Sequence, residues 1–172
     1  MNKVSAATGS AVFFACVPGV VAGVVPFVIT RWQWGEYRGS ALTALGVVLT
    51  VVGVGFLVHA FVRFVVEGSG TPAPIAPTQH LVVGGVFRYV RNPMYLAVLA
   101  TILGQAAILG DPRLVVYAAV VGCAVVAFVK AYEEPTLRAT YGADYEEYVR
   151  NVRGWVPRVL GARETRCARP VT

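Results

Sequence analysis

Four long blocks of apolar residues dominate the sequence and constrain its fold more than any other feature. They cover residues 6–29, 41–62, 94–109 and 114–129. The apolar residues form continuous blocks rather than one periodic helical face, which is typical of segments that cross a bilayer. Only 14% of the residues are charged, too few to coat a water-soluble domain of this size. The pattern predicts an all-α polytopic membrane protein with four transmembrane helices.

Proline and polar residues modify this pattern at three points. Pro18 and Pro26 interrupt the first block, which a membrane helix tolerates because neighbouring helices re-satisfy the freed backbone groups. The third block is short for a crossing, so its helix is expected to begin slightly upstream of residue 94. After the fourth block, a polar segment at 130–141 and an amphipathic stretch at 143–152 predict a cytoplasmic C-terminal helical segment.

The sequence divides into three parts. Residues 1–66 hold the first two predicted helices, which we interpret as a scaffold. Residues 67–160 hold a loop rich in Gly and Pro, the last two predicted membrane helices and the C-terminal helical segment, and we interpret them as the functional core. Residues 161–172 form a basic tail that is expected to be disordered.

Lysine and arginine fall unevenly on the two sides of the predicted membrane. With four crossings, both termini and the loop between the second and third helices share one side. That side holds twelve basic residues, against three on the other side. Because basic residues are enriched in cytoplasmic loops, we expect an integral cell-membrane protein whose N- and C-termini and polar loop are cytoplasmic.

The net charge and the cysteines indicate no other class of protein. The charge of +6 follows from this topology, since the sequence lacks the fold signatures of nucleic-acid binders. Cys16, Cys123 and Cys167 show no CxxC or CxxxH spacing. Neither a disulfide framework nor a metal site is therefore predicted. The expected partners are the bilayer and lipophilic molecules, and the oligomeric state is left open.

A polar cluster at residues 79–95 leads directly into the third apolar block. It joins the pair Gly84 and Gly85 with arginines, aromatic residues and an Asn-Pro dipeptide. Glycine permits positive φ and close approach of the backbone to a ligand. Asn92, pushed out of helical geometry by Pro93, is placed to cap the third helix. The alternative is a membrane anchor, in which arginines bind lipid phosphates and tyrosines lie at the interface.

A second cluster, Glu133 and Glu134, follows the fourth apolar block. Adjacent carboxylates at a membrane border are costly unless they are exposed or paired. Lys130 and Arg138 lie at helical spacings from these acids, so local ion pairs are available to satisfy them. The functional alternative is that one carboxylate faces inward and binds a cationic group of a ligand.

Together these residues resemble the signature of the isoprenylcysteine carboxyl methyltransferase family, which is related to the membrane phospholipid methyltransferases. The resemblance runs in order from about residue 79 to residue 157, nearly half of the chain. It rests on LVxxGVFRxxRNPxY at 81–95, EExxL at 133–137, YGxxYxxY at 141–148 and the closing Val156-Pro157. The N-terminal half matches only as apolar helices.

The resemblance implies a methyltransferase core at 67–160 that binds S-adenosylmethionine without a Rossmann sheet. Glu133 is implied to bind the methionine end of the cofactor, whose ammonium group gives a carboxylate a partner. Arg88 or Arg91 is implied to bind the cofactor carboxylate. We assign catalytic roles to Arg91 and Glu134, and Glu134 would act as the general base for acceptors that need one. The residues implied to line the cofactor are Gln79, His80, Leu81, Val82, Phe87, Asn92, Pro93, Met94, Tyr95 and Glu133.

Two departures from the family pattern concern the substrate. Asn92 stands where many members have His, and Val129 stands one turn before the first acid, where prenylcysteine-specific members tend to carry Arg. We expect an isoprenylcysteine carboxyl methyltransferase-like enzyme acting on a lipophilic substrate. A phospholipid N-methyltransferase and a small-thiol S-methyltransferase are the alternatives on the same scaffold. A non-enzymatic transporter or structural protein is the alternative of another class. A transporter should place an ionisable residue deep within a helix. His59, in the second apolar block, is the nearest candidate for such a residue.

Overall fold

A computed structural model of the protein describes residues 17–35, 39–68, 81 and 83–157. In these residues the regular secondary structure is entirely helical, which confirms the all-α prediction. Two single π-helical turns, η1 and η3, and one 3₁₀ turn, η2, accompany the α-helices. The elements are η1 (Val20–Val24), α2 (Val25–Thr30), α3 (Ser40–Gly68), η2 (Gly85–Arg88), α4 (Pro93–Leu109), α5 (Pro112–Phe128), η3 (Val129–Glu133) and α6 (Glu134–Asn151).

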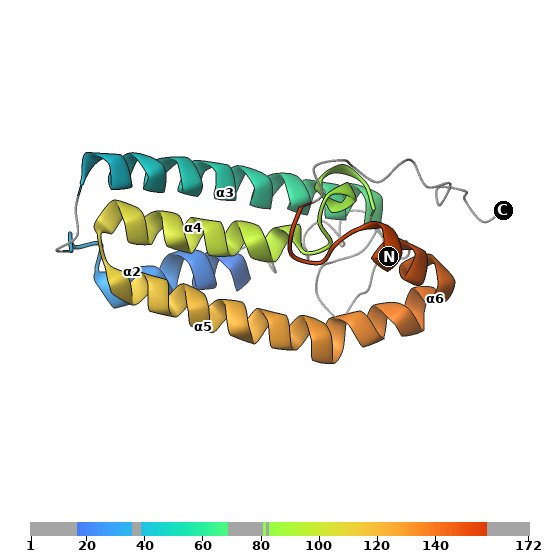
Figure 1. Ribbon diagram of the computed structural model, residues 1–172. Coiled ribbons are helices and arrows are strands. Elements are labelled where there is room, and N and C mark those ends of the chain that lie inside the picture. The colour runs from blue at the N-terminus through green and yellow to red at the C-terminus, as the bar shows by residue number, and fades with distance from the viewer. Residues whose placement is uncertain (1–16, 36–38, 69–80, 82, 158–172) are drawn as a thin grey trace.

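The apolar blocks form helices that lie side by side and alternate in direction (Figure 1). The helix ending in η1–α2, then α3, α4 and α5, correspond to the four predicted segments, although residues 6–16 of the first lie outside the described residues. Helix α4 begins at Pro93, which confirms the expected upstream start. Helix α5 continues through η3 into α6, and this long element, Pro112–Asn151, is interrupted at Gly142.

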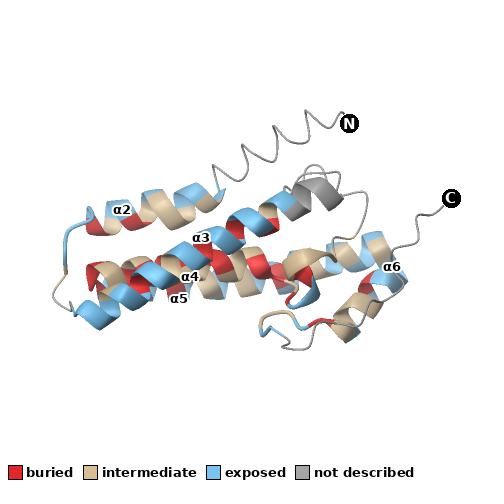
Figure 2. Ribbon diagram, turned by 90° about the horizontal axis from the view of Figure 1, so that it is seen from above, coloured by how far each residue is buried: buried red, intermediate tan, exposed pale blue. Residues whose placement is uncertain are grey.

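Two of these helices are long and apolar enough to cross a membrane, namely Ser40–Val62 and Pro112–Asn151. Only 17% of the residues in the apolar stretch of each are buried within the structure. The apolar helices Val17–Thr30 and Pro93–Leu109 are shorter. Buried positions lie on the inner sides of the helices, and the outer sides are exposed (Figure 2). Such extensive exposed apolar surface is typical of a membrane protein rather than of a soluble one.

Helices α3 and α4 pack closely because glycines line their contact. A Cβ atom added to Gly46 of α3 would lie 2.6 Å from the Gly104 carbonyl oxygen of α4, and one added to Gly104 would lie 2.8 Å from the Gly46 carbonyl oxygen. Two turns further along α3, a Cβ on Gly53 would lie 3.0 Å from the Ala97 carbonyl oxygen. Small residues at a helix contact let backbones approach in this way. The α3–α4 contact is therefore a closely packed one.

We expect Gly46→Ala to destabilise the protein by roughly 1–3 kcal/mol, the range for overpacking. The added methyl group meets backbone atoms of α4, which cannot move aside without separating the helices. Gly55→Ala is the matched control, because it lies in the same helix and its added Cβ would have no described atom within 4 Å. That control should be neutral or stabilising by up to about 1 kcal/mol through helix propensity. Thermal unfolding in detergent can be followed by circular dichroism. Equal unfolding midpoints for the two variants would contradict this packing.

Each π-helical turn is followed by a proline. Turn η1 ends at Val24 and Pro26 follows, whereas η3 ends at Glu133 and Pro135 follows. Proline has no N–H group, and its ring crowds the carbonyl group four residues earlier. The helix accommodates both effects by widening locally.

Side chains of neighbouring helices bind two carbonyl groups of the π turn before Pro26, where the Val25 N–H goes to Val20 and Pro26 has no N–H to donate. The Tyr117 hydroxyl donates to the Val21 carbonyl at 2.9 Å, and the Gln105 side-chain amide donates to the Ala22 carbonyl at 2.7 Å. An unpaired carbonyl in hydrocarbon costs several kcal/mol. These two hydrogen bonds therefore hold the first helix against α4 and α5.

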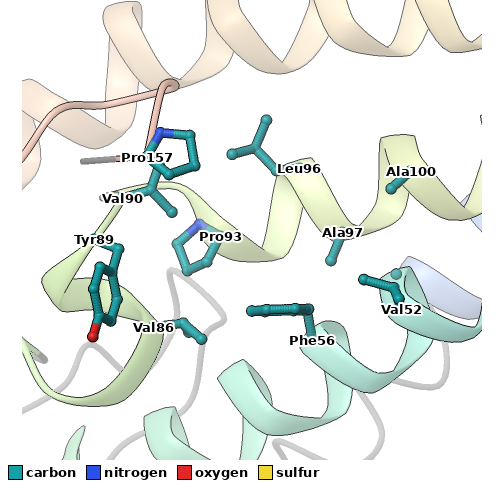
Figure 3. A pocket seen from close by; sticks show the side chains of 11 residues that line it. Val52, Phe56, Val86, Tyr89, Val90, Pro93, Leu96, Ala97, Ala100 and Pro157 are labelled. Carbon is teal, nitrogen blue, oxygen red and sulfur yellow. The ribbon is translucent and has the colours of Figure 1, made fainter. Parts of the chain in front are cut away.

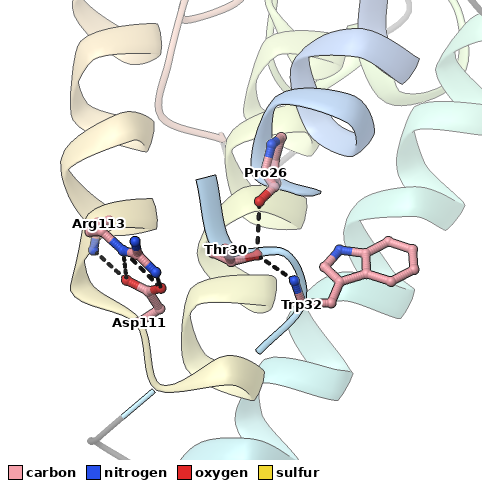
Figure 4. A network of polar contacts seen from close by, with 5 residues as sticks. All are labelled: Pro26, Thr30, Trp32, Asp111 and Arg113. Atoms are coloured by element: carbon pink, nitrogen blue, oxygen red, sulfur yellow. Dashed lines mark hydrogen bonds and ion pairs between the residues drawn. The ribbon is translucent and has the colours of Figure 1, made fainter. Parts of the chain in front are cut away.

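The end of the bundle away from α6 is closed by local polar contacts (Figure 4). Asp111 caps α5 by accepting the Arg113 backbone N–H at 2.9 Å, and the Arg113 guanidinium lies 2.6 Å from its other oxygen. Hydrogen bonds from Arg113 hold the pKa of the Asp111 carboxyl below its ordinary value. Nearby, the Thr30 hydroxyl donates to the Pro26 carbonyl at 2.8 Å and accepts from the Trp32 N–H at 3.1 Å. The polar groups in each of these two turns are thus hydrogen-bonded within their own turn.

Candidate functional site

At the opposite end of the bundle, the N-terminus of α4, the η3–α6 junction and residues 152–157 come together (Figure 1). This arrangement depends on a break in α6 at Gly142, whose φ of 50° and ψ of −120° are accessible to glycine. The chain turns back after this break, and the Arg91 N–H donates to the Arg153 carbonyl at 2.9 Å. The returning segment is thereby fixed along the residues that precede α4.

Asn92 is the N-cap residue of α4, as predicted, and its backbone is non-helical, but its side chain makes no capping hydrogen bond. The Asn92 side-chain amide instead donates to the Gly154 carbonyl at 3.1 Å, and its backbone N–H contacts the same oxygen at 3.2 Å. The two contacts place Gly154 so close that an added Cβ would lie 3.3 Å from an Arg91 guanidinium nitrogen. Asn92 therefore joins the C-terminal segment to α4. Of the two glycines expected to allow positive φ, Gly85 has φ 56° but Gly84 lies in the extended region.

Glu133 faces into this end of the bundle rather than into solvent. Its carboxylate accepts a hydrogen bond from the Tyr95 hydroxyl at 2.9 Å, and the Tyr95 ring lies 6.4 Å from the Trp155 ring. Burial raises the pKa of the Glu133 carboxyl above its ordinary value, and the charge of Glu134 adds to this, against the opposing effect of the Tyr95 hydrogen bond. In the part of the chain that the structure describes, no lysine or arginine forms an ion pair with Glu133.

Glu134 has different surroundings, because its carboxylate pairs with Arg91. The two charged groups are 3.2 Å apart, and their side chains are only 22% and 16% exposed. The same Arg91 nitrogen donates to the Tyr145 hydroxyl at 3.1 Å. The Arg91 Nε is buried and has no hydrogen-bond partner among the described residues. Arg91 thus connects the loop before α4 to both halves of α6.

The local ion pairs considered for the two acids are not formed in the described structure. Arg138 pairs with Glu146 at 2.8 Å, and Lys130 is exposed. Glu134 finds its cation 43 positions earlier in the chain instead, at Arg91. Helical spacing alone points to partners on the same helix, and it misses a partner brought in by the fold.

The other predicted site residues fall into four groups. Phe87 is buried, and its carbonyl accepts a hydrogen bond from the Tyr148 hydroxyl at 2.7 Å. Pro93 and Met94 open α4, and Met94 packs against the apolar core. Leu81 is half-buried. The predicted cofactor residues that lie outside the described residues are Gln79, His80 and Val82.

Four residues of this region carried no role in our sequence-based prediction. Tyr145 and Tyr148 anchor α6 on Arg91 and on the Phe87 carbonyl, respectively. Gly154 and Trp155 bring the C-terminal segment against Asn92 and Tyr95. The regular spacing of the tyrosines in the 141–148 motif was the signal for the first two. The second pair depends on contacts that sequence spacing does not reveal.

Comparison with protein families identifies the chain. The model of the phospholipid methyltransferase family matches residues 41–144. The chain belongs to the phospholipid methyltransferase family. Comparisons with curated proteins and with solved structures found no match.

Within this phospholipid methyltransferase family member, the matched region begins in α3 and ends just beyond the break in α6. It contains Arg91, Tyr95, Glu133 and Glu134, whereas Trp155 lies after it. The predicted resemblance is confirmed. Family membership and the exposed apolar helices together indicate a membrane methyltransferase.

Proposed function

We propose that the protein is an integral membrane methyltransferase that uses S-adenosylmethionine to methylate a lipophilic acceptor. The observation that carries this proposal is Glu133, a largely buried carboxylate whose pKa is raised and which has no cation partner in the described residues. Burying a carboxylate is costly unless something pairs with it. A cationic ligand group would provide that pair, and the ammonium group of the cofactor has the required charge.

The residues around Glu133 suit this cofactor. Tyr95 holds the carboxylate through its hydroxyl, and Trp155 covers Tyr95 from the C-terminal side. The unpartnered Nε of Arg91 is a buried donor that suits a carboxylate. S-adenosylmethionine, when bound, supplies a methyl group already activated on a sulfonium sulfur. The protein therefore contributes mainly by orienting the acceptor and excluding water.

Arg91 and Glu134 are predicted to act in catalysis, and their contacts support at least a positioning role. The Arg91 guanidinium lies between Glu134 and the Tyr145 hydroxyl, which fixes α6 relative to α4. An acceptor carboxylate would need no general base, whereas an amine or thiol would, and Glu134 remains our candidate for that base. Gln79, His80, Leu81 and Val82 are proposed to complete the cofactor site from the preceding loop.

We further propose that all four apolar helices cross the membrane, with both termini and the site on the cytoplasmic side. The 17 residues of α4 span about 26 Å at 1.5 Å per residue, slightly less than a hydrocarbon core of about 30 Å. The division into a scaffold at 1–66, a methyltransferase core at 67–160 and a basic tail at 161–172 belongs to the same proposal. Membership of the phospholipid methyltransferase family supports a phospholipid as a second possible class of acceptor, in addition to an isoprenylcysteine-type acceptor.

Isothermal titration of the purified protein with S-adenosylhomocysteine tests the function directly. We expect saturable binding to one site, since this product carries the same ammonium and carboxylate groups as the cofactor. No detectable binding at millimolar ligand would refute the methyltransferase proposal. Such a result would favour the transporter or structural alternative instead.

The affinity for S-adenosylhomocysteine should fall as the pH is lowered. The carboxylate is the form of Glu133 that attracts an ammonium group, and its raised pKa means that it protonates at a higher pH than an ordinary glutamic acid. Binding should therefore weaken as the pH falls through that raised pKa. Titrations at several values from about pH 8 down to pH 5, above the ordinary pKa of Glu, would measure the effect. Equal pH dependence in Glu133→Gln would assign it to another group.

A further inference from the structure

The chain after α6, residues 152–157, forms a return segment that is neither helix nor strand. It runs from the end of α6 back to the start of α4 (Figure 1). The Arg91 N–H donates to the Arg153 carbonyl at 2.9 Å. Asn92 contacts the Gly154 carbonyl with its backbone N–H at 3.2 Å and with its side-chain amide at 3.1 Å. These contacts fix the return segment on α4 although it has no regular structure of its own.

The far end of the return segment lies at an apolar cavity between α3 and α4 (Figure 3). Pro157 lines this cavity together with Val90 and Pro93. A proline side chain loses almost no conformational entropy when it packs. Because Pro93 and Tyr95 are two positions apart on α4, they lie roughly 200° apart around its axis. The return segment therefore passes over the start of α4, from Trp155 beside Tyr95 to Pro157 at the cavity.

The position of the Glu133 carboxylate depends on Tyr95. The Tyr95 hydroxyl donates to this carboxylate at 2.9 Å, and no ion pair among the described residues holds it. A glutamate side chain has several rotatable bonds, so a hydrogen bond restrains it only as firmly as the donor is itself held. The direction in which Glu133 presents its charge therefore follows the orientation of the Tyr95 ring.

The Tyr95 ring is in turn held by Trp155. The two ring centres are 6.4 Å apart and their planes are inclined by 33°, within the range of about 4.5–7 Å over which aromatic rings attract each other. Both residues are half-buried. The indole has only two rotatable bonds and a large contact area, so it restrains a neighbouring ring at a low cost in entropy. The contacts from Trp155 to Tyr95 to Glu133 thus connect the return segment to the carboxylate.

We propose that Trp155 is a positioning residue, which holds Tyr95 against Glu133 and so directs the carboxylate toward the ammonium group of S-adenosylmethionine. This role rests on the proposed methyltransferase function and adds to it a residue outside the region that the family model matches. Without Trp155, the two side chains occupy the binding orientation for a smaller fraction of the time, and the apparent affinity falls in proportion. Because such coupling is reciprocal, the bound ligand should also hold the return segment more firmly.

Titration calorimetry of the purified full-length protein with S-adenosylhomocysteine tests this role. We expect Trp155→Ala to weaken binding roughly 2- to 10-fold, the range that corresponds to the loss of one aromatic pair. Trp155→Phe keeps a ring and should retain most of the affinity. Val156→Ala is the matched control, because Val156 is the next residue of the return segment and is 59% exposed. An unchanged affinity in Trp155→Ala, or an equal loss in Val156→Ala, would overturn the proposal.

A double-mutant cycle with Tyr95 distinguishes positioning from a direct contact with the ligand or a purely structural role. Tyr95→Phe keeps the ring beside Trp155 but removes the hydroxyl that binds Glu133. If Trp155 acts through that hydroxyl, adding Trp155→Ala to Tyr95→Phe should change the affinity by less than about twofold. Losses that add in the double variant would refute the positioning role.

Fluorescence quenching provides a test that leaves Trp155 in place, in case Trp155→Ala does not fold. The chain has three tryptophans, and the other two, Trp32 and Trp34, are exposed at the opposite end of the bundle. In Trp32→Phe/Trp34→Phe, all tryptophan emission therefore comes from Trp155. Saturating S-adenosylhomocysteine should reduce the quenching of this emission by acrylamide, and unchanged quenching would overturn the proposal.

The wild-type titration separates the two proposals. A wild type that binds no S-adenosylhomocysteine refutes the methyltransferase function and the role of Trp155 with it. A wild type that binds, together with a Trp155→Ala variant of equal affinity, refutes the role of Trp155 alone.

Discussion

Glu133→Gln should weaken the binding of S-adenosylhomocysteine by roughly 10- to 100-fold, the largest effect we expect from a single change of one functional group. The substitution keeps the size of the side chain but removes its negative charge. A hydrogen bond to a charged group contributes about 1.5–3 kcal/mol, which corresponds to this range of affinity. Titration calorimetry of the two proteins would measure the difference. An unchanged affinity would place the cofactor elsewhere.

The same substitution should not reduce the stability of the ligand-free protein. Burial raises the pKa of Glu133, so the folded protein binds a proton more readily than the unfolded chain. The contribution of this group to stability therefore falls as the pH rises through the interval between the unfolded and the raised folded pKa. Above that interval the charged form is a cost that glutamine removes. Glu146→Gln is the matched control, because Glu146 lies in α6 beyond the break at Gly142, is exposed, and pairs only locally with Arg138.

Arg91→Met should destabilise the protein by roughly 3 kcal/mol, the expected cost of leaving a largely buried charge without its partner. The substitution removes the cation that lies 3.2 Å from Glu134 and the donor to the Tyr145 hydroxyl. The midpoint of thermal unfolding in detergent should fall by several degrees. A variant as stable as the wild type would show that the pair contributes little to the folded state.

The double variant Arg91→Met/Glu134→Gln separates the structural contribution of this pair from its predicted catalytic role. Neutralising Glu134 removes the unpaired charge, so the double variant should recover much of the lost stability. If Arg91 also acts on the bound ligand, the double variant will remain stable but transfer methyl groups slowly. If both stability and activity return, the residue acts only by positioning α6.

The sequence predicts the starts of α4 and α5 and the end of α4 well, because strong local signals mark them. Pro93 and Pro112 begin helices, and Gly110 ends one with a φ of 66°. The second apolar block, 41–62, matches the apolar span Ser40–Val62, and the helix continues beyond this span to Gly68. Charged residues after an apolar block indicate where a helix leaves the membrane, and they do not by themselves end it.

The candidate site is less accessible from sequence, because its contacts join segments that are far apart. Glu133 and its neighbour are adjacent in the chain, yet one binds the hydroxyl of Tyr95 and the other binds Arg91. Local spacing could not distinguish these two environments. The role of Trp155 likewise depends on the reversal of the chain after Gly142, whose backbone conformation is a property of the folded structure.

The π-helical turn η3 changes the rotation of α6 about the helix axis relative to α5. A π turn holds more residues than an α turn, so the residues after it are rotated by roughly one position, about 100°, relative to an uninterrupted α-helix. Pro135 follows this turn and is itself exposed. Without the π turn η3, the helix would continue in the α-helical phase of α5. Other side chains would then take the directions now held by Glu133 and Glu134. The π turn before Pro135 thus sets the direction of Glu134 relative to the apolar part of the same helix.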